Sequence, residues 1–210
     1  VELPEEFQPF ISLRKQNIIA KHAINYLQKR GLTYADILKH NIGFCEIGKY
    51  KNMVIIPSYS GKGELDYFIA RSFEENPSKR IKAPISDKNI IGFESLINWN
   101  LPIIIAEGPF DAIAIKRNAI PLFGKIISPK LRNKLMLNKV KSVYLALDKD
   151  AIKNTIKIAE ELIHLGKKVY VMRMEDKDPS SLGFKEFNNQ IQQLKPFSLM
   201  DLIKLKMEIK

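Results

Sequence analysis

The sequence predicts an α/β protein in which a parallel sheet flanked by helices follows a small α+β domain. From Leu101 onward, short apolar runs alternate with helical patterns, as in sheets built from strand–helix–strand units. Before that point the chain shows a hairpin pattern and a basic stretch. We expect three segments. They are a basic α+β domain over 1–100, the parallel-sheet domain over 101–184, and the start of a helical segment over 185–210.

Two helices and a hairpin are expected in the first hundred residues. Apolar residues recur at helical spacing between Asn17 and Lys29, and Gly31 ends this helix. Thr33 is the expected N-cap of a short second helix. A Ser-Gly-Lys-Gly turn at 60–63 separates two strand-forming runs, a hairpin signal. These strands are expected at 53–57 and 65–71.

Four strands and three helices are expected after Leu101. Pro109 and Pro129 stand where a proline suits the first helical turn, with Ser128 as the N-cap before Pro129. Gly166 ends the third helix. The strands are expected at 103–106, 120–123, 143–147 and 168–173, and the helices at 109–118, at 128–137 and up to Leu165. A final helical stretch over 184–210 is interrupted near Lys195-Pro196.

Three acidic patches follow or close predicted strands. They are Glu107-Gly-Pro-Phe-Asp111, Asp148-Lys149-Asp150 and Asp176-Lys-Asp178-Pro179. The carboxyl ends of parallel strands share one edge of a sheet, where ligands bind. Crowded carboxylates repel one another unless a cation or a proton offsets them, and Mg²⁺ prefers oxygen ligands of this kind. The sequence therefore predicts a divalent-cation site at this edge.

The acidic residues also suggest a division of labour. Asp148 and Asp150 are two residues apart, so their side chains can point the same way. Asp111 falls in a first helical turn, where the helix dipole stabilises a carboxylate. Glu107 is then free to act as a general acid or base. This combination suits phosphoryl transfer, in which metal-bound aspartates stabilise charge and another group handles a proton.

Composition narrows the class of protein further. The 210 residues carry a net charge of +11, which predicts attraction to polyanions such as nucleic acid. A single cysteine excludes an internal disulfide framework and a multi-cysteine zinc site, so we expect no zinc in this chain. No apolar run reaches the roughly 20 residues of a membrane span, and no signal peptide is evident. A cytoplasmic location without membrane contact is expected.

These acidic patches resemble the three motifs of the TOPRIM fold, which primases, topoisomerases and some nucleases share. The flanking sequence is similar to bacterial-type and phage-type DNA primases over about residues 20–200. The similar segments are Tyr26–Leu32, Asn41–Phe44, Val54–Pro57, Ile69–Arg71, Lys79–Pro84, Ile90–Leu96 and Phe187–Leu199. The resemblance implies a Rossmann-like TOPRIM domain after a basic subdomain, as part of a primase catalytic core encoded by a phage.

The resemblance also implies a function and roles for single residues. The chain would synthesise short RNA primers on single-stranded DNA from nucleoside triphosphates, with Mg²⁺ or Mn²⁺ as cofactor. Segments outside this chain would bind a replicative helicase, and the location would be the host cytoplasm. Glu107 would be the catalytic acid or base. The implied metal ligands are Asp111, Asp148, Asp150 and Asp178, and the implied phosphate-binding residues of the basic subdomain are Arg71, Lys79, Arg80 and Lys82.

The chain departs from the family pattern at several positions. Lys149 stands between the two aspartates where glycine is usual, so either the bulkier loop would alter nucleotide access or Lys149 would supply a phosphate contact. Ile152 and Lys153 replace smaller residues after them. Ser180 stands where a second acid often follows the proline, which shifts the expected third-motif ligand toward Asp176.

Two other functions stay open at this point. The first is a nuclease of the same fold, although the N-terminal half lacks the ATPase domain such nucleases usually carry. The second is a nucleic-acid-binding TOPRIM module without turnover, because the loop after Asp150 is altered. A topoisomerase is disfavoured, since nothing marks one of the seven tyrosines as a nucleophile.

Overall fold

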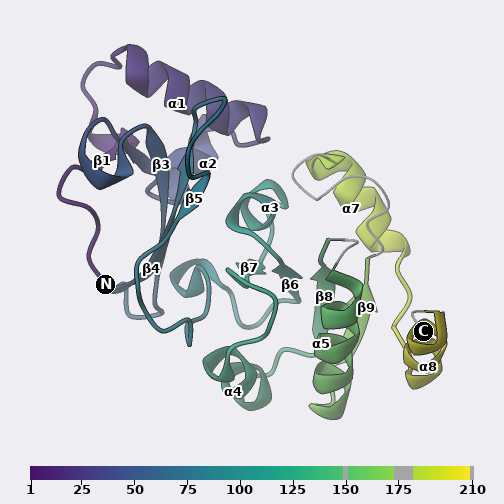
Figure 1. Ribbon diagram of the computed structural model, residues 1–210. Helices are drawn as coiled ribbons and strands as arrows, with labels where there is room; N and C mark the ends of the chain where they lie inside the picture. Colours follow the sequence, from purple (N-terminus) through teal and green to yellow (C-terminus); the bar gives the residue numbers. More distant parts are fainter. Residues whose placement is uncertain (149–150, 173–181, 209–210) are drawn as a thin grey trace. The chain divides into compact units, whose positions relative to one another are not determined.

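The computed structural model describes residues 1–148, 151–172 and 182–208. The chain divides into two compact units, Val1–Lys88 and Asn89–Lys210 (Figure 1). The functional assignment of the segments 1–100, 101–184 and 185–210 stays a prediction. None of the described helices is long and apolar enough to cross a membrane.

The first unit contains a five-stranded antiparallel sheet with strand order β1-β2-β3-β4-β5. The predicted hairpin forms its centre, and Gly63 (φ +81°) takes the left-handed conformation that its turn requires. Two bonds to Ser60 Oγ, from the Lys62 and Glu64 amides, stabilise this turn. The strands are β1 Gln8–Pro9, β2 Gly43–Cys45, β3 Met53–Tyr59, β4 Leu65–Ser72 and β5 Ile81–Lys82.

Both helices of this unit begin with a side-chain cap, and the second cap is the predicted Thr33. Asn17 accepts a hydrogen bond from the Ala20 amide at the start of α1 (Ile18–Lys29). Thr33 and Asp36 form a capping box at the start of α2 (Tyr34–Lys39). The sequence also forms two short 3₁₀ helices, η1 Phe10–Ser12 and η2 Gly48–Tyr50. Phe10 and Phe44 stack in the core at a centroid distance of 5.0 Å.

The second unit contains a four-stranded parallel sheet with strand order β7-β6-β8-β9. This confirms the predicted parallel α/β architecture. The central strands are almost wholly apolar, as expected for strands covered on both faces. The strands are β6 Ile103–Ala106, β7 Ala119–Pro121, β8 Ser142–Ala146 and β9 Lys168–Val171.

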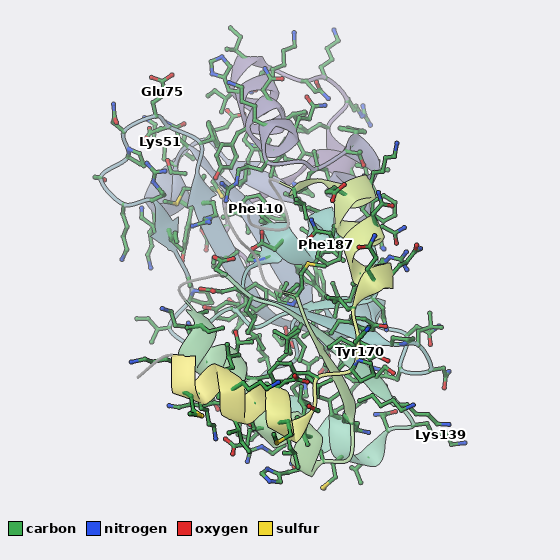
Figure 2. All side chains as sticks on the ribbon, turned by 90° about the vertical axis from the view of Figure 1, so that its right-hand side faces the viewer. Lys51, Glu75, Phe110, Lys139, Tyr170 and Phe187 are labelled. Carbon is green, nitrogen blue, oxygen red and sulfur yellow. The ribbon has the colours of Figure 1, made fainter. Side chains whose placement is uncertain are left out.

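Helices cover both faces of this sheet. Inward-facing residues of β6 and β8 share a core with α4, α5 and α8. On the other face, Ile191 of α7 shares a cavity with Ile104 and Tyr144. Figure 2 labels two fully buried aromatic side chains of this unit, Phe110 on α3 and Phe187 on α7. The helices are η3 Glu94–Leu96, α3 Pro109–Ala114, α4 Pro129–Leu137, α5 Ile152–His164, α7 Phe184–Gln193 and α8 Leu199–Glu208.

Some predicted elements are too long. Helix α3 ends at Ala114 rather than Asn118, because Lys116 (φ +52°) leaves the helical conformation. Strand β7 stops at Pro121, and Phe123 (φ +50°) turns the chain away from the sheet. Strand β9 ends at Val171. Within the described residues, the other helices and strands of this unit begin and end within a residue or two of the predicted positions.

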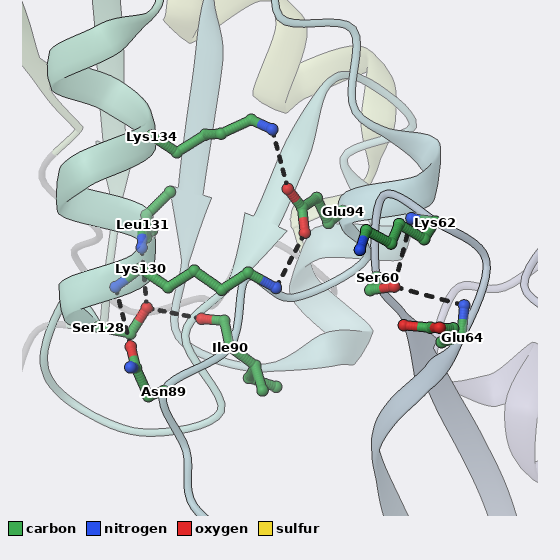
Figure 3. A network of polar contacts seen from close by, with 10 residues as sticks. All are labelled: Ser60, Lys62, Glu64, Asn89, Ile90, Glu94, Ser128, Lys130, Leu131 and Lys134. Atoms are coloured by element: carbon green, nitrogen blue, oxygen red, sulfur yellow. Dashed lines mark hydrogen bonds and ion pairs between the residues drawn. The ribbon is translucent and has the colours of Figure 1, made fainter.

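A polar network joins the entry of the second unit to helix α4 (Figure 3). The carboxylate of Glu94 is buried and forms ion pairs with Lys130 and Lys134, with each Nζ 3.2 Å from a carboxylate oxygen. Ser128 Oγ donates to the Ile90 carbonyl at 2.6 Å, and the Lys130 amide donates to Asn89 Oδ1 at 2.8 Å. The residues before the sheet are therefore tied to the first turn of α4.

Candidate functional site

Two of the predicted catalytic carboxylates follow the ends of adjacent central strands. Ala106 and Ala146 are paired across β6 and β8. Glu107 directly follows the first, and Asp148 lies two residues after the second. Both side chains are half-buried, and one oxygen of each, Glu107 Oε2 and Asp148 Oδ1, is wholly shielded from solvent. The parallel topology therefore brings both acids to one sheet edge.

Asp111 occupies the first turn of α3, which starts one residue after Gly108. A Cβ atom placed on Gly108 would lie 3.3 Å from Asp111 Oδ2, so the carboxylate folds back over the N-terminal residue of the helix. Its negative charge lies at the positive end of the helix, which stabilises the ionised form. Glycine at 108 leaves the space that this carboxylate occupies.

The remaining predicted residues of this edge lie outside the described part of the chain. They are Lys149, Asp150, Asp176 and Asp178. Within the described residues, no group of three or more histidine, cysteine, aspartate or glutamate side chains is arranged to hold a metal ion. The donors that are described at this edge, carboxylate oxygens with partly shielded positions, suit a hard cation such as Mg²⁺. The metal site stays a prediction.

The first unit carries a groove of about 1140 Å³ along one side of α1. Residues of α1 at helical spacing form one wall, and the chain around Asn52, Phe73 and Arg80 forms the other. Cationic, amide and aromatic side chains line it together with two glutamates. The lining residues used below are His22, Asn25, Tyr26, Lys29, Lys51 and Arg80.

The predicted basic residues take different places around this sheet. Arg80 lines the groove, and the side chain of the neighbouring Lys79 is exposed. Lys82 Nζ donates to the Lys49 carbonyl at 2.6 Å. Arg71 lies in β4 opposite Ile81 of β5, and its Nε is buried. The structure thus brings one of these four residues, Arg80, into the groove.

Sequence reasoning missed the cationic side chains that α1 and the β2–β3 turn contribute to the groove. Lys29 and Lys51 line it, and so does His22. The available signal was the spacing of His22, Tyr26 and Lys29 on one face of a helix. That spacing also fits an ordinary solvated face, so it identified no site by itself.

Comparison with known proteins places the chain in a family. No protein-family model matches it. The uncharacterized protein MG010 of Mycoplasma genitalium is 30% identical over 154 residues, which cover 67% of this chain and 68% of that protein. The chain belongs to the MG010 family.

Solved primase structures share the fold of this MG010-family chain. A DNA primase domain from Pseudomonas aeruginosa superposes with a TM-score of 0.76 at 21% identity, covering 95% of this chain and 80% of that one. The zinc-binding and RNA polymerase domains of the Aquifex aeolicus primase give 0.73 at 19% identity, covering 92% of this chain. The MG010-family chain spans 60% of that Aquifex chain.

A third structure is the DnaG primase catalytic domain bound to single-stranded DNA, with a TM-score of 0.74 at 18% identity. It is matched over 92% of this chain and 76% of its own length. This member of the MG010 family therefore has the fold of a bacterial-type DNA primase catalytic core. The expected TOPRIM-containing fold is confirmed.

Proposed function

We propose that this chain is the catalytic core of a DNA primase that synthesises short RNA primers on single-stranded DNA. The observation that carries the proposal is the placement of Glu107 and Asp148 after adjacent central strands, within a fold shared with primase catalytic cores. Acids at the carboxyl edge of a parallel sheet meet ligands there. In a chain with net charge +11, nucleic acid and nucleotides are the fitting partners.

In this proposal Glu107 is the proton-transfer group. The 3′-hydroxyl of one nucleotide attacks the α-phosphate of the next, a phosphodiester bond forms and pyrophosphate leaves. Glu107 receives the hydroxyl proton, and its shielded Oε2 keeps the carboxylate partly out of water. Asp111 and Asp148, with Asp150, Asp176 and Asp178 outside the described residues, would hold Mg²⁺ or Mn²⁺. The ion would stabilise charge on the phosphates.

The groove of the first unit would hold the single-stranded template. Lys29, Lys51 and Arg80 offer cations to phosphates, and Tyr26 offers an aromatic ring to a base. A replicative helicase, bound through segments outside this chain, belongs to the same proposal, as does an origin in a phage.

Primer synthesis tests the function directly. The chain would be incubated with single-stranded DNA, labelled nucleoside triphosphates and Mn²⁺, beside the Glu107→Gln and Asp148→Asn variants. Glu186→Gln is the matched control, because Glu186 is an exposed acid on α7. We expect products of a few nucleotides from wild type and Glu186→Gln, and at least a hundredfold loss in the other two.

Two results would contradict the proposal. Full synthesis by Glu107→Gln would remove that residue from proton transfer. Release of nucleotides from the DNA in the absence of any triphosphate, lost in Asp148→Asn, would identify a nuclease with the same acids.

A further inference from the structure

A second cavity lies in the second unit, among residues that the catalytic proposal does not use. It has a volume of about 520 Å³. Its walls come from the end of α7, the segment that joins α7 to α8, the first two turns of α8 and the end of β9 (Figure 1). The lining residues that matter below are Met172, Gln190, Gln193, Lys195, Phe197 and Lys204.

The cavity is fixed by hydrogen bonds and by core packing on its outer side. The Phe197 amide donates to the Val169 carbonyl at 2.7 Å, which ties the connecting segment to the edge of β9. Ser198 donates to Asp201 Oδ2 through its amide and its hydroxyl, at 2.8 and 2.7 Å. Leu202 and Leu205 bury the far side of α8 in the core. A cavity held in this way costs little ordering when a ligand binds.

The lining offers two kinds of uncharged contact. Val171, Met172 and Phe197 present apolar atoms, a surface for a flat ring. The amides of Gln190 and Gln193 present hydrogen-bonding groups, although Gln190 Nε2 already donates to Glu186 at 3.1 Å. Those amides suit the edge of a base.

Charge in the lining favours an anion. Lys195 of the connecting segment and Lys204 of α8 supply two ammonium groups. Asp201 is the one acidic side chain among the described lining residues, and its Oδ2 accepts hydrogen bonds from the amide and the hydroxyl of Ser198. Two ammonium groups against one carboxylate leave the described lining with a net positive charge. An apolar surface, amides and two ammonium groups together match a nucleotide.

We propose that this cavity binds a nucleoside triphosphate, with the base against Met172 and Phe197 and the phosphates at Lys195 and Lys204. Its volume lies within the range of small-molecule sites. Glu107, Asp111 and Asp148 do not line it. The site is thus a second nucleotide site, and it does not require the primase function to be correct.

Nucleotide binding without metal tests this site. Fluorescent N-methylanthraniloyl-ATP would be titrated into the whole chain in EDTA, which removes divalent cations from the carboxylate edge. We expect saturable binding that Lys204→Glu and Lys195→Glu each weaken at least tenfold. Lys185→Glu is the matched control, because it makes the same charge change on α7 outside the lining. It should bind like wild type.

Competition identifies what the cavity recognises. Unlabelled ATP should displace the probe better than either adenosine or tripolyphosphate. Tripolyphosphate equal to ATP would overturn the base contact, and adenosine equal to ATP would overturn the phosphate contact. The site itself would be refuted by absent saturation in EDTA, or by equal loss in Lys185→Glu and Lys204→Glu.

Discussion

At the scale of single residues, His40 links the first unit to pH. Burial and, to a smaller extent, the neighbouring Lys39 lower the pKa of its imidazole from 6.5 to about 4, against the opposing effect of Asp36. The unfolded chain therefore binds a proton at His40 between about pH 6.5 and pH 4, while the folded chain does not. Its contribution to stability is complete above pH 6.5 and is lost as the pH falls through this window.

Acid should therefore destabilise the chain through His40. Between pH 7.5 and pH 5 we expect this residue to lower the free energy of unfolding by about 2 kcal/mol. Urea denaturation followed by circular dichroism at both pH values measures the change, and His40→Gln should remove that part of it. His22→Gln is the control because His22 is exposed. An unchanged pH dependence in His40→Gln would contradict the assignment.

Gly108 controls the position of one proposed metal ligand. Alanine there would place its Cβ 3.3 Å from Asp111 Oδ2, so that carboxylate must move by a few tenths of an ångström. Alanine is also a poorer N-cap than glycine, which costs about 0.5–1 kcal/mol. We expect Gly108→Ala to raise the Mg²⁺ concentration needed for half-maximal primer synthesis.

Gly124→Ala provides the comparison for this substitution. A Cβ on Gly124 would meet its nearest neighbouring atom, the Leu122 carbonyl oxygen, only at 3.9 Å. Its metal requirement should match wild type. If Gly108→Ala and wild type need the same Mg²⁺ concentration, Asp111 is not a metal ligand.

At the scale of elements, helix α1 carries two lysines that can serve as test and control for DNA binding in the groove. Lys29 and Lys21 are both exposed lysines of α1, but only Lys29 is among the groove-lining residues. We expect Lys29→Glu to weaken single-stranded DNA binding about equally for all sequences. The slope of the logarithm of the binding constant against the logarithm of salt concentration should fall in magnitude by about one. Fluorescence anisotropy at several salt concentrations measures both. If Lys21→Glu and Lys29→Glu lose the same DNA affinity, the groove does not bind the template.

The elements that sequence could predict are those whose signals are local. Thr33 and Ser128 cap their helices as expected, because a cap depends on a few neighbouring residues. Strands β1, β2 and β5 were missed, since two or three residues carry no periodicity. The pairing of β1 also depends on a distant partner, because Gln8 lies opposite Phe44 of β2.

The functional residues also differ in how far sequence could place them. Glu107 and Asp148 could be placed from sequence, because a parallel sheet carries its strand ends to one edge. The groove of the first unit and the cavity beside α7 could not be predicted from sequence. Their residues come from segments that only tertiary packing brings together, such as Lys29 with Arg80, or Gln190 with Lys204.

At the scale of the whole molecule, each compact unit contains its own natural probe. Cys45, the single cysteine, lies buried in the first unit, where burial and Glu6 raise its pKa to about 12. Its thiol is therefore unreactive until that unit opens. Trp99, the single tryptophan, packs against the core of the second unit. The two units can thus be followed separately in one sample.

Phe44→Ala should separate the two units in a urea titration. Phe44 is fully buried and stacks on Phe10, so its loss should cost the first unit about 3–5 kcal/mol. Thiol labelling of Cys45 should then occur at lower urea, while the fluorescence transition of Trp99 stays in place. A shift of both transitions by the same amount would show that the units unfold together.

The strand order of the second sheet also bears on synthesis of the chain at the ribosome. Strands β6 and β8 are neighbours in the sheet, yet the chain between them contributes α3, β7 and α4. Glu107 is therefore translated well before β8, the strand that brings Asp148 to the same edge. A nascent chain that stops before Asp148 carries the glutamate but not the second acid of this edge. Under the proposed function, chains released early would thus make no primers.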